Sequence, residues 1–114
     1  MERTQGKTTV SAEVLTTIAR LAALSVPVVS RMAPVSGGVN RLFRRGMGEG
    51  IRIQTDNNFV FADLYLVLKQ DVNIREVSRN IQLNVARAIQ EMVGMEVGNI
   101  NIHVEDIEYE EAEA

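Results

Sequence analysis

The chain has 114 residues, enough for one domain with a single core, and its 46% hydrophobic and 24% charged residues are typical of a soluble globular protein. Because it contains no cysteine, disulfides, cysteine nucleophiles and zinc–thiolate sites are excluded. The net charge of −3 is unevenly distributed, since six acids and no base follow position 104 and leave the preceding part mildly basic.

The first predicted elements are a short strand and a helix. We expect residues 1–6 to form a flexible N-terminus and residues 7–10, which are rich in β-branched side chains, to form a strand. Ser11 is a suitable N-cap for the helix that follows, and Pro27 must end this helix by Ser25 or Val26. Three- and four-residue spacing predicts one apolar stripe on it, with Thr16 outside the stripe: Val14, Leu15, Ile18, Ala19, Leu21 and Ala22.

Residues 28–50 give the weakest secondary-structure signal. Residues 28–32 fit either a short strand or an extended connection, and both interpretations stay open. Glycines 46, 48 and 50 invite comparison with a phosphate-binding loop. No lysine follows them, however, and Ile51 begins a strand rather than a helix, so we expect a turn or hinge.

The connection also carries the one basic cluster of the chain. We treat Arg41, Arg44, Arg45 and Arg52 as a candidate contact for an anion or an acidic partner, because clustered guanidinium groups can hold phosphates. A solvated loop explains the same residues. RNA recognition is disfavoured because Asp63 interrupts the nearby aromatic residues and no GxxG motif is present.

Residues 51–69 predict a two-stranded hairpin. Ile51, Ile53 and Thr55 alternate with polar residues, and Asp56-Asn57-Asn58 can form a tight turn. The second strand, 59–69, has one wholly apolar face that should contact the helices. Its other face is half aromatic and would be exposed on a monomer, so it is our candidate oligomer face: Phe59, Phe61, Tyr65 and Val67.

The most legible stretch is a long amphipathic helix followed by a strand. Asn73 and Glu76 have the spacing of a capping box, and Gly94 is placed to end the helix. Alternation over residues 100–104 predicts a final strand. The predicted core stripe of the helix is Ile74, Val77, Ile81, Val85, Ala88, Ile89 and Met92.

These elements predict an α+β domain over residues 7–104, followed by an acidic, disordered tail over 105–114. The expected order is β-α-β-β-α-β, with a mainly antiparallel sheet and both helices packed on one face. The order of the strands in space does not follow from the sequence.

No catalytic, metal-binding or cofactor-binding residue is predicted. His103 is the only histidine, and without cysteine a zinc site would need almost only carboxylates. Neither a nucleophile nor an orienting acid is identifiable near it, and Asp63 and Glu91 have no partner that the sequence reveals. We therefore expect a non-enzymatic protein without a cofactor.

Several motifs, taken in order, resemble the alkaline shock protein family of bacteria. They are Val10-Ser11, Val14-Leu15, Ile18-Ala19-Arg20, Val26-Pro27, Val29, Asn73-Ile74-Arg75-Glu76-Val77, Ile81-Gln82, Val85, Ile89-Gln90-Glu91-Met92, Gly94-Met95, Val97 and Ile100-Asn101-Ile102-His103-Val104. The family usually has glycine where this chain has Val28, which puts the turn geometry there in doubt. The resemblance implies a small non-enzymatic protein of cell-envelope stress or homeostasis, with some members recruited to the membrane by a small integral partner.

The leading functional hypothesis is a cytoplasmic interaction or scaffold protein that forms a symmetric homo-oligomer and docks on a membrane-anchored partner. No signal-peptide pattern precedes the first helix, and the longest apolar stretch, residues 21–29, is far below the roughly 20 residues of a membrane span. The alternative hypothesis is a phosphate- or nucleic-acid-binding module that uses the arginine cluster.

Overall fold

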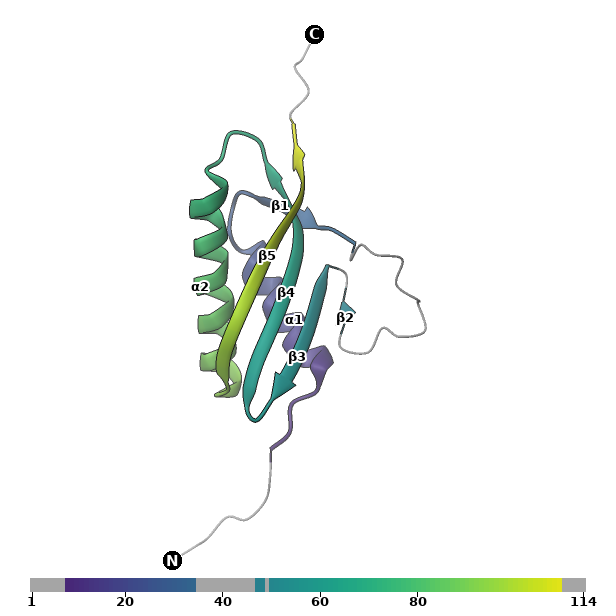
Figure 1. Cartoon of the computed structure of the whole chain (residues 1–114), viewed down its shortest axis with the longest axis vertical. Coiled ribbons are helices and arrows are strands. Elements are labelled where there is room, and N and C mark those ends of the chain that lie inside the picture. The colour runs from purple at the N-terminus through teal and green to yellow at the C-terminus, as the bar shows by residue number, and fades with distance from the viewer. Residues whose placement is uncertain (1–7, 35–46, 49, 110–114) are drawn as a thin grey trace, which may run out of the picture.

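The computed structural model describes residues 8–34, 47–48 and 50–109. They form helices α1 (Ala12–Leu24) and α2 (Ile74–Val93) and strands β1 (Val29–Met32), β2 (Met47–Gly48), β3 (Ile51–Asp56), β4 (Phe59–Lys69) and β5 (Glu96–Glu108). The strands make one sheet, and both helices lie on the same side of it (Figure 1). The predicted α+β class, with two helices on one face of a mainly antiparallel sheet, is confirmed.

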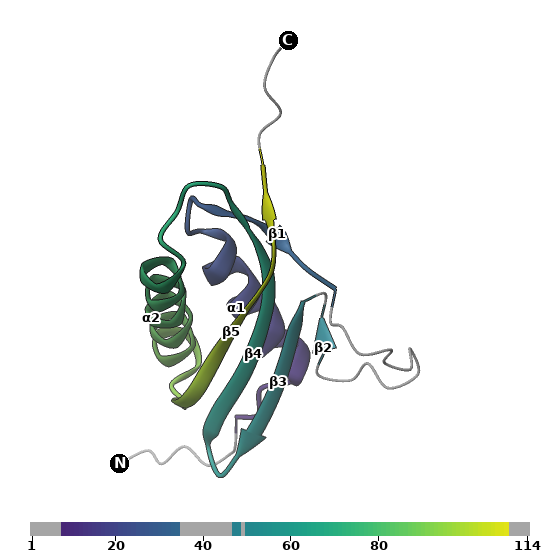
Figure 2. The same ribbon diagram turned by 45° about the horizontal axis from the view of Figure 1, so that its top comes forward.

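Strand β4 is the centre of the sheet. Along one edge β5 pairs with it in parallel over the whole of Phe59–Lys69. The other edge is shared, since β3 pairs antiparallel with residues 59–64 and β1 pairs antiparallel with residues 66–68. Strand β2 extends the sheet beyond β3. Figure 2 shows α2 alongside β5 and α1 behind β3 and β4.

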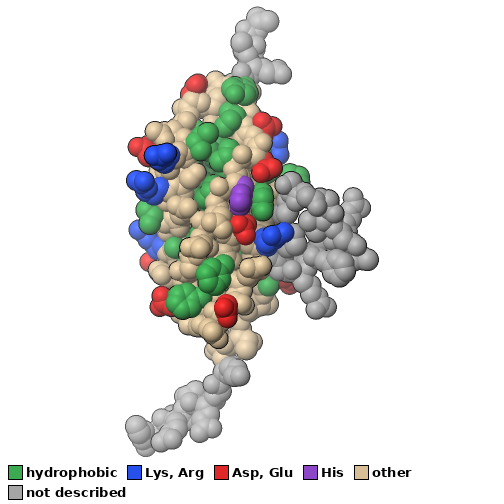
Figure 3. All heavy atoms as spheres, in the orientation of Figure 1, with side chains coloured by type: hydrophobic (Ala, Val, Ile, Leu, Met, Phe, Trp, Pro, Cys, Tyr) green, Lys and Arg blue, Asp and Glu red, His purple; other side chains and the backbone are tan. Residues whose placement is uncertain are grey.

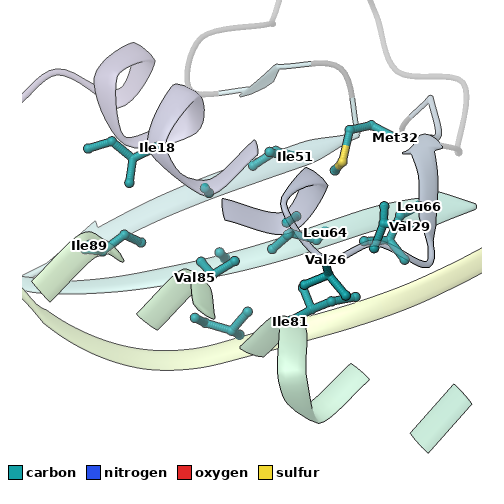
Figure 4. Close-up of a cluster of buried hydrophobic side chains, with 14 of the residues drawn as sticks. Ile18, Val26, Val29, Met32, Ile51, Leu64, Leu66, Ile81, Val85 and Ile89 are labelled. Carbon is teal, nitrogen blue, oxygen red and sulfur yellow. The ribbon is translucent and has the colours of Figure 1, made fainter. Parts of the chain in front are cut away.

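The core fills the space between the helices and the inner face of β4. That face is the predicted apolar one, and each of its side chains is at most 1% exposed: Val60, Ala62, Leu64, Leu66 and Leu68. Ile18 from α1 and Ile81, Val85 and Ile89 from α2 point into the same cluster (Figure 4). Burial of each large aliphatic side chain contributes about 1.5–3 kcal/mol.

Local signals set the element boundaries as predicted. The Ser11 hydroxyl accepts a hydrogen bond from the Val14 amide at 3.2 Å, and Asn73 Oδ1 accepts one from the Glu76 amide at 3.0 Å. Gly94 ends α2 in the left-handed conformation, with φ 74°. Asn57 and Asn58 have φ values of 50° and 72°, as a tight hairpin turn requires.

Two predicted boundaries are wrong. Residues 8–10 form no strand, and the open segment 28–32 supplies β1 instead. Strand β5 continues to Glu108, so residues 105–108 belong to the sheet rather than to a tail. Ile107 lies opposite Leu68 there and packs against the core, which holds this acidic stretch in register. Residues 1–7 and 110–114, to which the flexible N-terminus and the rest of the tail were assigned, lie outside the described residues.

The outer surface of α1 also differs from its predicted stripe. Val14 and Leu21, which belong to the predicted apolar stripe, are 46% and 62% exposed, whereas Thr16, which was placed outside it, is buried. The Thr16 hydroxyl has no hydrogen-bond partner within the described part of the chain. None of the helices in that part is long and apolar enough to cross a membrane.

Gly50 joins three strands. The Ala33 amide donates to the Tyr65 carbonyl at 2.7 Å, and the Tyr65 amide donates to the Gly50 carbonyl at 2.7 Å, so β1 and β3 abut along β4 at this point. Gly50 has φ 75°, and a Cβ there would lie 2.5 Å from the Ala33 oxygen. Only glycine fits this position, which explains why the predicted turn ends with a glycine. The first glycine of that turn, Gly46, lies outside the described residues.

Candidate functional site on the open face of the sheet

The face of the sheet opposite the helices carries the predicted oligomer residues, but they differ in exposure. Phe59 is 43% exposed, Phe61 and Tyr65 are half-buried, and Val67 is only 2% exposed. Val67 lies between Arg31 of β1 and Asp106 of β5, next to irregularities in both pairings. The flanking strands therefore cover Val67, and its assignment to an exposed patch is wrong.

Two phenylalanines form the apolar part of this face. The rings of Phe59 and Phe61 stack with their centroids 6.5 Å apart. Phe61 also lies against the backbone of Gly98 on β5, where a Cβ would come closer than 3.0 Å to three ring atoms. Phe61 is therefore held by β5, while Phe59 is the more accessible ring.

A polar cluster lies further along the same two strands. His103 Nε2 and Asp63 Oδ1 are 3.0 Å apart, and Asn101 Nδ2 donates to the same oxygen at 3.1 Å. The imidazole of His103 stacks on Tyr65 with ring centroids 4.4 Å apart and planes 12° apart. Figure 3 views this face, with the histidine near its middle beside acidic and basic side chains.

Asp63 is the electrostatic centre of the cluster. Burial alone would raise the pKa of its carboxyl group. Hydrogen bonds from His103 and Asn101, together with the positive charges of His103 and Arg52, outweigh burial and hold the pKa of Asp63 below its ordinary value. The carboxylate is thus ionised and fixed in position on the open face.

This arrangement orients side chains but does not form a recognisable reaction centre. Asp63 fixes one ring nitrogen of His103, as an orienting acid does in a catalytic pair. No hydroxyl or other nucleophile is hydrogen-bonded to the imidazole within residues 8–34, 47–48 and 50–109. In the same ranges, no three His, Cys, Asp or Glu side chains are grouped as they would be to hold a metal ion.

Of the predicted arginine cluster, the structure describes only Arg52. Arg52 lies on β3 directly opposite Asp63, so its charge faces a carboxylate. Arg41, Arg44 and Arg45 lie outside the described residues. An anion site formed by the four arginines remains a prediction.

Sequence reasoning missed the cluster around Asp63. Asn101 and His103 lie 38 and 40 residues from Asp63 in the chain, and they reach this part of β4 only because β5 pairs in parallel with it in one register. The alternation of residues 100–104 indicated a wet face for His103. It carried no signal about which strand would lie beside it.

The fold and this face define a small α+β domain with a sheet surface that neither α1 nor α2 covers, and a family model matches residues 1–109. The chain belongs to the alkaline shock protein 23 family, whose function is cell envelope-related. The resemblance carried by the helix and strand motifs is therefore confirmed.

The relatives are uncharacterized bacterial proteins. YqhY of Bacillus subtilis is 28% identical over 92% of this chain and 79% of its own length. YloU of the same organism is 24% identical over 90% of this chain and 88% of its own length. Spy1535 of Streptococcus pyogenes is 37% identical over 56% of this chain and 50% of its own length.

Solved structures support the fold alone. The copper form of the MamM CTD has a TM-score of 0.50 and 14% identity, over 90% of this chain and 89% of that chain. A variant of the MamM CTD has a TM-score of 0.50 and 15% identity, over 82% and 95% of the respective chains.

Proposed function

We propose that the protein is a non-enzymatic interaction protein of the cell envelope that self-associates through the open face of its sheet and is recruited to the membrane by an anchored partner. The family supports the link to the envelope. Self-association, a cytoplasmic location and the membrane partner extend beyond the family description and form the proposal.

The observation that carries self-association is the exposure of Phe59 on a sheet face that neither α1 nor α2 covers. Phe59 stacks on Phe61, and Phe61 is held against Gly98, so the pair presents a firm apolar surface. Burial of aromatic rings between two copies would remove this surface from water. In a symmetric dimer the same patch is used twice, and it therefore has to be self-complementary.

The polar cluster gives this face its specificity. Asp63, Asn101 and His103 form a fixed hydrogen-bonded group beside the aromatic pair. Such a group restricts which surfaces can pack on the rings, because a mismatched partner would leave the carboxylate buried without its usual hydration.

The test is the concentration dependence of mass, measured by light scattering for the wild type and for Phe59→Glu. We expect a larger mass for the wild type, and dissociation in the variant, because a charge would be buried at the contact. Leu24→Glu is the matched control, since Leu24 is 39% exposed at the end of α1, on the helix side of the sheet. A wild type that stays monomeric at high concentration, or a Phe59→Glu variant with unchanged mass, would contradict the proposal.

Phosphate or nucleic-acid binding is the second hypothesis from the sequence, and no described contact favours it, since Arg52 already faces Asp63. Its test is binding of RNA and of anionic liposomes with and without Arg41, Arg44 and Arg45. A genuine phosphate contact would weaken as the salt concentration rises.

A further inference from the structure

An apolar groove runs between the two helices, on the side of the molecule opposite the open face of the sheet. It is lined by Val14, Ile18 and Leu21 of α1 and by Ala88 and Met92 of α2, and its volume is about 700 Å³. The helices are antiparallel, since the first turn of α1 meets the last turn of α2. Beyond the other end of α1, Asn84 donates a 3.4 Å hydrogen bond to Ser25.

The walls of the groove are unusually exposed for apolar side chains. Val14, Leu21 and Met92 are 46%, 62% and 69% exposed, whereas Leu15 and Ile89, on the same two helices, are fully buried. The apolar stripes of the helices are therefore wider than the core can bury, and their exposed side chains meet in the groove. A continuous apolar surface of this kind marks an interaction site.

The hydroxyl group in the groove adds little cost to the binding of an occupant. The Thr17 hydroxyl donates to the Glu13 carbonyl at 3.0 Å, so this side chain satisfies its donor within α1. An occupant can cover Thr17 without leaving an unpaired hydroxyl, the usual cost of burying such a residue.

We propose that the groove binds an amphipathic helix of a partner protein, with apolar residues at i, i+3 or i+4, and i+7 and with a lysine or arginine near Glu13. A groove between two helices accepts a third helix by the same packing of ridges into grooves that joins the first two. The 13 residues of α1 give it a length of about 20 Å, so about 14 residues of a partner helix fill it.

The charge of the lining selects the chemistry of the partner. Glu13 is the one charged residue among those that line the groove in the described part of the chain. A basic side chain on the partner would pair with it at the rim, whereas an anionic membrane surface would meet it with like charge. The groove therefore fits a protein helix with basic residues better than it fits an anionic lipid surface.

This inference rests on the interaction role proposed above but uses the opposite face of the molecule. Substitutions in the groove leave Phe59 untouched, and Phe59→Glu leaves the groove untouched. Failure of one proposal can therefore be told from failure of the other.

The experiment titrates the full chain with synthetic peptides and follows binding by fluorescence anisotropy. The probe is a helix of about 14 residues with leucine at i, i+3 or i+4, and i+7 and lysine elsewhere. A scrambled peptide of the same composition, and a version with glutamate in place of lysine, are the peptide controls. We expect saturable binding of the probe, weaker binding of the glutamate version, and no saturable binding of the scrambled peptide.

Matched protein variants locate the contact. Leu21→Glu and Met92→Glu should each lower the affinity for the probe peptide at least about tenfold, which corresponds to about 1.4 kcal/mol of binding free energy. Leu83→Glu, on α2 but outside the groove, should bind like the wild type. Glu13→Lys should reverse the preference between the lysine and glutamate peptides, and circular dichroism of each variant confirms that it is folded.

Three kinds of result would overturn the proposal. The first is equal binding of the probe and the scrambled peptide, or unchanged binding by folded Leu21→Glu. The second is a dimer that Leu21→Glu dissociates, which would assign the groove to a second copy of the chain. The third is binding to phosphatidylglycerol vesicles that Leu21→Glu abolishes, which would assign it to a membrane surface.

Discussion

The ring of Phe61 on β4 lies against the backbone of Gly98 on β5, at a place where any Cβ would come closer than 3.0 Å to three ring atoms. Glycine in a strand weakens it, because it has no side chain to pack and loses more backbone freedom on folding. Here the neighbouring aromatic ring covers the gap, as aromatic side chains do for glycines in designed sheets.

The contact predicts a non-additive pair of substitutions. Gly98→Ala should lower the free energy of unfolding by about 1–3 kcal/mol, because the new methyl group overlaps the Phe61 ring. In a Phe61→Ala background the same change should cost much less. Urea denaturation of the four proteins in this cycle measures the coupling. Equal costs in the two backgrounds would show that the ring is not what excludes a side chain at position 98.

Alanine substitutions at Gly50 and Gly94 separate two costs to stability, that of a left-handed backbone conformation and that of steric overlap with neighbouring atoms. Both have positive φ, 75° and 74°, but a Cβ on Gly50 would meet the Ala33 and Tyr65 oxygens, whereas nothing lies within 4 Å of one on Gly94. Gly94→Ala should cost about 1–2 kcal/mol of stability for the left-handed conformation alone. Gly50→Ala should cost about 1–3 kcal/mol more. Thermal or urea unfolding that gives the two variants the same stability would refute the role of Gly50 as the close junction of three strands.

The lowered pKa of Asp63 predicts a pH dependence with a definite sign. A carboxyl group whose pKa is lower in the folded than in the unfolded protein stabilises the fold above its ordinary pKa of 3.8, and this contribution is lost as the pH falls through the lower folded value. Asp63→Asn does not titrate. The wild type should therefore be more stable than Asp63→Asn near neutral pH, and the difference should shrink in acid. Urea denaturation at a series of pH values down to about 2 measures it. A difference that stays constant or grows in acid would contradict the assignment.

The buried hydroxyl of Thr16 predicts a stabilising substitution. Thr16 is 5% exposed and its Oγ1 has no partner among the described residues, so its hydroxyl carries an uncompensated desolvation cost. Thr16→Val keeps the shape and should raise the free energy of unfolding by about 1 kcal/mol.

Thr17→Val is the control for Thr16→Val. Thr17 is exposed and already bonded to the Glu13 carbonyl, so its replacement should change stability by no more than about 0.5 kcal/mol. A stability loss in Thr16→Val comparable to that of other core variants would show that the hydroxyl has a partner after all.

Much of the fold follows from local signals. Asn73 and Gly94 delimit α2, Ser11 begins α1 and the asparagine turn closes the hairpin, because each of these depends on neighbours within a few residues. The strand predicted at residues 7–10 failed for a non-local reason. Its β-branched residues suit a strand, but residues 8–10 pair with none of the described strands, and composition alone cannot show whether a sheet edge lies within reach.

The sites were harder to predict because they depend on the register between strands and on which side chains are buried by neighbouring elements. The alternation of β4 placed Phe59, Phe61 and Tyr65 on one face correctly, yet it could not show that neighbouring strands bury Val67. An amphipathic stripe likewise says which residues could be buried together, without saying how wide the available core is. Leu21 and Met92 were assigned to the core for that reason, and they lie in the groove between the helices.

The central position of β4 has a consequence for how the protein folds during synthesis. One edge of this strand is completed by β1 and β3, which a ribosome makes earlier, but the other edge waits for β5, which is made only after the whole of α2. Until then a strand that carries Leu64, Leu66 and Leu68 has an unpaired edge, and an edge of this kind readily pairs with other chains. A nascent chain that stalls within α2 would be the most aggregation-prone intermediate, whereas release of β5 pairs the second edge of β4 along its whole length.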